Sequence, residues 1–112
     1  MIMETAELTG DALDWAVVNS TVDDSCKGDE AFIKGHLSRG SPSRDWKEGG
    51  VLIEEWGVTV MFDPKCSPHF IAMTPYGGVG EGHSHLVASM RAIVNSRAGQ
   101  FVEIPDRFLE VV

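Results

Sequence analysis

Residues 41–54 read Ser-Pro-Ser-Arg-Asp-Trp-Lys-Glu-Gly-Gly-Val-Leu-Ile-Glu, and this stretch joins a turn to an apolar run. Pro42 fixes its own backbone φ and biases Ser41 toward an extended conformation, while the Ser43 hydroxyl is suited to bonding nearby backbone groups. The first half of the stretch is therefore predicted to be a rigid turn. Its second half passes through two glycines into the apolar run, which predicts a β-strand over residues 51–55.

The chain after this stretch has the pattern of a small antiparallel sheet. Residues 58–62 form a second run rich in β-branched residues, separated from residues 51–55 by a Trp-Gly dipeptide, so the two runs predict a hairpin. Residues 69–73 are predicted to be a third strand, and residues 76–82 a glycine-dense loop. Residues 101–104 alternate between apolar and polar side chains, which predicts a short edge strand.

Two segments have the apolar period of helices that bury one face. The first covers residues 11–20, and the second covers residues 84–97 with a serine at its N-cap. Residues 21–40 show no clean period and are predicted to be a long surface connection with one short element, and the variable connection is placed at residues 18–40. Residues 105–112 form a tail that is apolar enough to dock on the body of the domain.

These elements predict a single α+β domain over residues 1–112. The expected order is α-β-β-β-α, with an antiparallel three- to four-stranded sheet and two helices packed on one face. A chain of 112 residues is long enough to form a stable hydrophobic core without disulfides or a structural metal. Double-stranded-RNA-binding domains share this order, but the acidic composition and the lack of a Lys-rich start to the second helix argue against that use.

The charge of the chain is strongly acidic. Nine Lys and Arg oppose 17 Asp and Glu, which gives a formal net charge of -8. This balance opposes direct nucleic-acid binding, which depends on cationic contacts to phosphate, and it permits a partner with a basic surface. No apolar run approaches the roughly 20 residues that a membrane helix needs, and the first residues do not resemble a secretory signal. We therefore expect a cytoplasmic protein without membrane contacts.

Two Asp-Trp pairs, two serines and an arginine form the predicted binding surface. These candidate residues are Asp14, Trp15, Ser41, Ser43, Asp45, Trp46 and Arg91. Arg91 is able to hold Asp14 or Asp45 in a bidentate pair, which would make the group structural, or the same carboxylates are presented to a ligand. Trp46 either closes one end of the core or anchors a partner. The sequence leaves both interpretations open, and alanine substitution of the two aspartates distinguishes them by the change in melting temperature.

Other chemistries have only partial patterns. The residue types that suit zinc occur at Cys66, His69, His83 and His85, but their spacing is loose, and incidental surface histidines explain the set better. Ser84 lacks the final glycine of a nucleophile elbow and is interpreted as a helix cap. The glycines of residues 76–82 fit neither the dinucleotide fingerprint nor the Walker A loop, although a nucleotide-binding loop stays as an alternative. No catalytic residue, cofactor or metal site is predicted.

Three blocks of the chain, in order, resemble the NinX-type bacteriophage proteins, a family of small domains of unknown function. Residues 7–17 read Glu-Leu-Thr-Gly-Asp-Ala-Leu-Asp-Trp-Ala-Val and resemble the opening of that family. Residues 41–54 resemble its central motif. Residues 86–91, Leu-Val-Ala-Ser-Met-Arg, followed by Gly99, Val-Glu and Pro105, resemble its closing segment.

The resemblance does not extend to every position. Residues 18–40 show no family pattern, Arg44 stands where the family tends to have a small hydroxyl residue, and Ser84-His85 stands in place of Thr-Pro. The resemblance implies a phage or prophage origin and an accessory role in the bacterial host cell, and it supplies no reaction.

Three functional hypotheses follow, and they belong to different classes. The first is a non-enzymatic acidic binding protein that acts on a host or phage protein, for example by inhibiting a host-defence complex. The alternative is a small-molecule or nucleotide-binding protein, with or without hydrolysis, that uses the glycine-rich loop and residues 41–46. The third is a homo-oligomeric structural protein with the tail or an edge strand as its interface.

Overall fold

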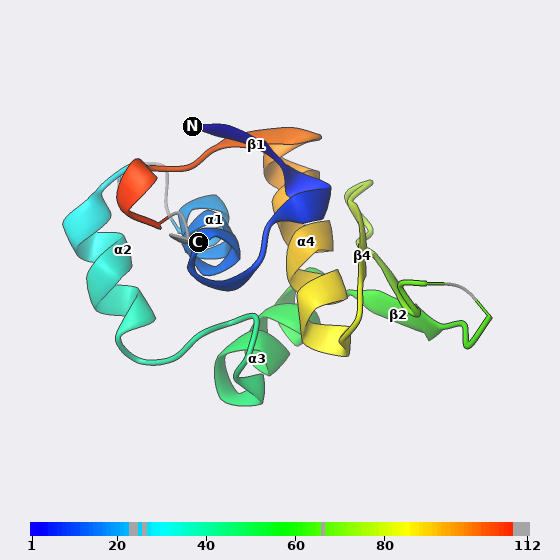
Figure 1. The fold of residues 1–112 in the computed structure, drawn as a ribbon. Helices are drawn as coiled ribbons and strands as arrows, with labels where there is room; N and C mark the ends of the chain where they lie inside the picture. Colours follow the sequence, from blue (N-terminus) through cyan, green and yellow to red (C-terminus); the bar gives the residue numbers. More distant parts are fainter. Residues whose placement is uncertain (23–24, 26, 66, 109–112) are drawn as a thin grey trace.

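The computed structural model describes residues 1–22, 25, 27–65 and 67–108 of the chain. These residues form four α-helices, five strands and short 3-10 turns (Figure 1). In chain order the elements are β1 (Ile2–Glu4), η1 (Thr5–Glu7), α1 (Gly10–Thr21), α2 (Glu30–Leu37), α3 (Trp46–Trp56), β2 (Thr59–Phe62), β3 (Phe70–Met73), β4 (Val79–Gly82), α4 (His85–Ala98), β5 (Phe101–Glu103) and η3 (Asp106–Phe108).

Helix α4 lies in the middle of the molecule, with α1 on one side and the β2-β3-β4 sheet on the other (Figure 1). The larger core fills the space between α1 and α4. Its buried members are Leu8, Ala12, Leu13, Trp15, Ala16, Val17, Val18, Ile33, Met90, Ile93, Val94 and Ile104. The smaller core lies between α4 and the sheet and consists of Ala72, Ala88 and Ala92. One helix therefore contributes to both apolar clusters.

The strands belong to two separate antiparallel sheets. Strands β2, β3 and β4 form a meander, and Val60, Ala72 and Gly80 stand opposite one another across it. Strands β1 and β5 form a two-stranded sheet, in which Ile2 pairs with Glu103. The predicted edge strand therefore exists, but it pairs with the start of the chain and not with the central sheet.

The α+β class is confirmed, and so are the two predicted helices, which correspond to α1 and α4. The strands predicted at 58–62 and 69–73 correspond to β2 and β3. The expected α-β-β-β-α order is incomplete, because α2 and α3 also precede the sheet and β1 precedes α1. Only α4 of the two predicted helices lies against the sheet, while α1 packs on the far side of α4.

The prediction of a strand over residues 51–55 is wrong, because these residues lie in helix α3. The Asp45 carboxylate accepts a hydrogen bond from the Lys47 amide at 2.9 Å and so caps the helix start. Gly57 ends the helix in the left-handed region, with φ of 62°. Leu52, Ile53 and Trp56 share the helix face that packs on the main core. Caps at both ends and this spacing outweigh the β preference of the apolar run.

Two other segments differ from the expectations. The predicted glycine loop contains strand β4, and the variable connection of residues 18–40 contains helix α2 together with the end of α1. Phe108 of the tail contacts Trp15 with ring centroids 6.0 Å apart, whereas residues 109–112 lie outside the described part. None of the described helices has the length and apolar character needed to cross a bilayer.

Candidate functional site

Asp14 joins helix α1 to the turn that precedes α3. Its side chain is buried, and its Oδ1 accepts a hydrogen bond from the Ser43 amide at 2.9 Å. Its Oδ2 accepts a short hydrogen bond from the Ser41 hydroxyl and lies 3.4 Å from Nη2 of Arg44. Arg44 also pairs with the exposed Asp11 at 3.2 Å. Asp14 therefore uses both carboxylate oxygens inside the fold.

The predicted turn is present, and Asp45 completes it. The carbonyl of Ser41 accepts hydrogen bonds from the amides of Arg44 at 3.1 Å and Asp45 at 2.7 Å. The Asp45 side chain caps α3, as described above. Three of the candidate binding residues, Ser41, Ser43 and Asp45, thus stabilise one local structure. The structure favours the structural interpretation of this cluster.

The two tryptophans of the Asp-Trp pairs have opposite environments. Trp15 is buried in the main core, and its indole N–H has no hydrogen-bond partner among the described residues. Trp46 is 56 % exposed at the start of α3, with its ring centroid 5.0 Å from that of His85. Trp46 is therefore the one of the two that is placed to contact a partner.

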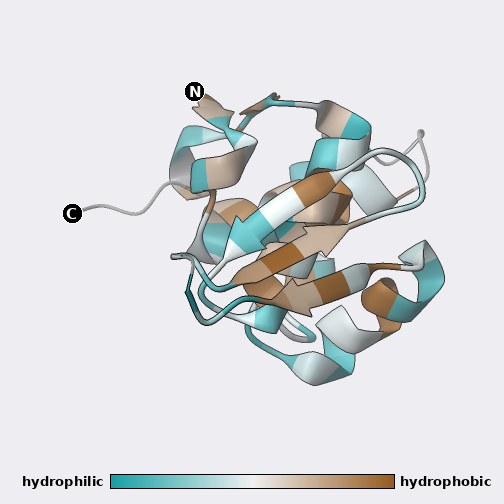
Figure 2. Cartoon of the chain, turned by 90° about the vertical axis from the view of Figure 1, so that its right-hand side faces the viewer, coloured by the Kyte–Doolittle hydropathy of each residue, from teal (hydrophilic) through white to brown (hydrophobic). Residues whose placement is uncertain are grey.

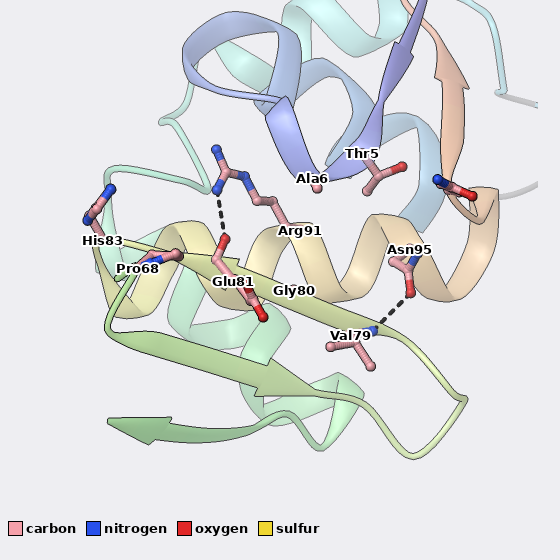
Figure 3. A pocket seen from close by; sticks show the side chains of 10 residues that line it. Thr5, Ala6, Pro68, Val79, Gly80, Glu81, His83, Arg91 and Asn95 are labelled. Atoms are coloured by element: carbon pink, nitrogen blue, oxygen red, sulfur yellow. Dashed lines mark hydrogen bonds between the residues drawn. The ribbon is translucent and has the colours of Figure 1, made fainter. Parts of the chain in front are cut away.

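Arg91 extends from α4 and connects two other segments (Figure 3). Its Nε donates to the Leu8 carbonyl at 2.9 Å, and its Nη1 donates to the Glu81 carbonyl at 2.7 Å. Arg91 therefore does not make the pair with Asp14 or Asp45 that one interpretation required: Arg44 pairs with Asp14, and Asp45 caps α3. Burial lowers the pKa of the Arg91 guanidinium from its ordinary value. A guanidinium nonetheless stays charged, because its ordinary pKa lies far above neutral pH.

A cavity of about 480 Å³ lies beside Arg91, between α4, the outer edge of β4 and the segment around Thr5 (Figure 3). The Val79 amide, on this edge, donates to Oδ1 of Asn95 at 2.9 Å. With the Arg91–Glu81 bond, this contact means that two α4 side chains form hydrogen bonds with backbone groups along the edge of β4. Arg91 and Asn95 thus hold the edge of the sheet to the helix.

The glycine segment proposed as a nucleotide loop is used for packing. The Gly78 amide donates to Oγ1 of Thr74 at 3.1 Å, and the Gly80 backbone pairs with β3. A Cβ on Gly80 would lie 2.4 Å from the Ala88 carbonyl oxygen and 2.4 Å from the Ala92 nitrogen. The glycines are therefore needed because the helix backbone lies directly on the strand. This geometry gives a phosphate-binding role no support.

Two histidines of the weak zinc alternative, His69 and His85, belong to a row of aromatic rings. His85 contacts Trp46 and Phe70, and Phe62 contacts both Phe70 and His69, with centroid separations between 5.0 and 6.3 Å. His83 is exposed near the cavity, and Cys66 lies outside the described residues. Within the described ranges, no group of three or more His, Cys, Asp or Glu side chains is placed to hold a metal ion.

The sequence did not reveal one exposed apolar surface, the sheet face that points away from α4 (Figure 2). We call it the open face. Its side chains are Thr59, Met61, Ile71, Met73, Val79 and Glu81. Met61, Met73 and Val79 are 47 %, 40 % and 49 % exposed. The alternation in residues 58–62 was a partial signal, but the loop prediction for β4 concealed the third strand.

The described residues therefore offer two kinds of surface. Polar clusters at Asp14 and Arg91 are engaged in hydrogen bonds within the fold, whereas apolar and aromatic side chains gather on the open face and along the aromatic row beside α4. Such surfaces suit contact with another molecule more than acid–base chemistry. Comparison of the sequence with protein-family models and with curated proteins finds no match.

Proposed function

We propose that this protein binds another protein without catalysing a reaction, and that the partner docks on the open face. The observation that carries the proposal is the exposure of Met61, Met73 and Val79 on a sheet face that no described helix covers. Contiguous exposed apolar surface commonly marks an interaction site.

The register makes these side chains neighbours. Met61 stands opposite Ile71, and Met73 stands opposite Val79, on adjacent strands. Directly opposed side chains in an antiparallel sheet have Cβ atoms about 5 Å apart, so the four form one continuous patch. The two methionines lack branching and adapt to different partner surfaces, which suits a binding face.

The partner that fits this face is apolar at its centre and basic at its rim. Glu81 lies at the border of the open face, and the chain carries a net charge of -8. Complementary charge accelerates association and falls in effect as salt is added. The resemblance to phage proteins suggests a host or phage protein as this partner, and a host-defence complex is one such target.

Replacement of Met73 and Val79 with lysine is expected to weaken partner binding at least about 30-fold, since central contacts of an interface are often worth 2 kcal/mol or more. Both side chains are 40 % or more exposed, so the melting temperature should change little. The measurement is capture of the partner from host lysate by tagged protein, followed by titration of the identified partner.

Phe101→Lys provides the matched control. Phe101 is 53 % exposed, but it lies in the other sheet, so this variant should bind as the parent protein does. Equal capture by the parent and by the Met73/Val79 variant would exclude the open face as the docking surface.

A further inference from the structure

Strand β2 is an edge of its sheet. The alternation of hydrogen bonds along the strand shows which of its backbone groups point away from β3. The Asp63 amide donates to the His69 carbonyl at 2.8 Å, and residues alternate in the direction of their bonds along a strand. Thr59 and Met61 therefore bond to β3, whereas the N–H and C=O groups of Val60 and Phe62 point away from it. These outward groups make no hydrogen bond with the described part of the chain.

The two edges of this sheet differ in how they are protected. On β4, Asn95 and Arg91 bond outward backbone groups at Val79 and Glu81. On β2, residues 59–62 read Thr-Val-Met-Phe and contain neither a charge nor a proline. Proteins normally protect an exposed edge with such residues, and an unprotected edge is a template for another strand. Phe62, at the end of this edge, is 60 % exposed.

We propose that the bare edge of β2 pairs with β2 of a second copy of this chain. The two strands run antiparallel about a two-fold axis at Met61, so that Val60 of each copy stands opposite Phe62 of the other. Two three-stranded sheets then become one continuous sheet of six strands. Each Val60–Phe62 pair exchanges two backbone hydrogen bonds, and Phe62 covers the partly exposed Val60 of the opposite copy.

Only this register uses every outward group of the strand. A shift of the axis to Val60 would place Phe62 opposite Val58, whose amide already donates to the Ile53 carbonyl at 3.0 Å. A shift to Phe62 would place Val60 opposite Pro64, which has no amide hydrogen. The strand is therefore complementary to itself around Met61.

The symmetric pairing also explains the apolar character of the strand. It places the two Met61 side chains beside each other, so the open faces of both copies merge into one apolar surface. The net charge of -8 on each copy opposes the approach, because the charges repel at long range. Added salt is consequently expected to strengthen the dimer.

Sedimentation and light scattering measure the assembly directly. We expect a mass of 24.4 kDa, twice the 12.2 kDa of one chain, that falls toward 12.2 kDa on dilution. Hydrogen exchange supplies a second readout, because the Val60 and Phe62 amides have no acceptor among the described residues of one copy. These amides should be protected in the dimer and exchange freely on dilution.

Phe62→Pro removes one outward N–H that makes no bond to the residues that the structure describes, and it should give a monomer even at high concentration. Phe62→Ala keeps the N–H and should retain part of the association. Phe101→Pro, on the edge of the other sheet, should leave the dimer intact. If Phe62→Pro does not fold, Phe62→Lys replaces it. The hydrogen exchange of the Val60 and Phe62 amides in the parent protein then still tests the proposal.

A protein that is monomeric at all concentrations overturns the proposal. So does a dimer in which the Val60 and Phe62 amides exchange freely, or one that Phe62→Pro does not affect. A monomer whose two amides become protected only when another protein is added would assign the edge to that protein instead. Loss of partner capture by the Met73/Val79 variant is independent of all these outcomes, so the two proposals fail separately.

Discussion

Replacement of Gly80 with alanine is expected to lower the free energy of unfolding by about 3 kcal/mol, near the upper end for overpacking. The added Cβ would lie 2.4 Å from backbone atoms of both Ala88 and Ala92. Backbone atoms of a helix do not rotate away as the end of a side chain does. Helix α4 must therefore move away from β4, which disturbs its packing against α1 as well. Urea unfolding followed by circular dichroism measures this change.

Gly35→Ala is the matched control, with the opposite sign. Gly35 lies within α2, and an added Cβ would have no neighbour within 4 Å. Alanine in a helix interior is more stable than glycine by roughly 1 kcal/mol, so this variant should be slightly stabilised. A Gly80→Ala protein as stable as its parent would contradict the close contact between strand and helix.

Asp14→Ala is expected to destabilise the protein by about 3 kcal/mol and to lower its melting temperature by about 10 °C or more. The substitution leaves the Ser43 amide without its acceptor, and Ser43 is 3 % exposed. It also removes the acceptor of the Ser41 hydroxyl and a partner of Arg44. Differential scanning calorimetry provides the measurement.

Asp11→Ala is the control that distinguishes the effect of a buried hydrogen-bonded carboxylate from that of an exposed ion pair. Asp11 and Asp14 both pair with Arg44, but Asp11 is exposed, so its removal should change stability by less than about 1 kcal/mol. Similar small losses in both variants would mean that Asp14 does not hold the turn, and would return it to the candidates for ligand contact.

Local signals in the sequence predicted part of this fold. The apolar period identified α1 and α4, and a serine cap marked the start of α4. The same reasoning failed for α3, where the β-branched run concealed the helical spacing of Leu52, Ile53 and Trp56. The signals that would have corrected it are short-range: an aspartate at the start of α3 and a glycine at its end.

The candidate site was less predictable, since its contacts depend on tertiary placement. Arg91 bonds to backbone carbonyls of Leu8 and Glu81, and residue types give no indication of such partners. Gly80 suggested a loop, because the sequence does not show that the predicted helix α4 packs directly on it. The open face could be recognised only after the strand that completes it had been placed.

The position of α4 has a consequence for how the molecule unfolds. Met90, Ile93 and Val94 line one apolar cluster, while Ala88 and Ala92 line the other. Unfolding of α4 would expose both apolar clusters at once. We therefore expect the two clusters to unfold together in one transition. Calorimetry should accordingly register a single heat-absorption peak whose van't Hoff and calorimetric enthalpies agree.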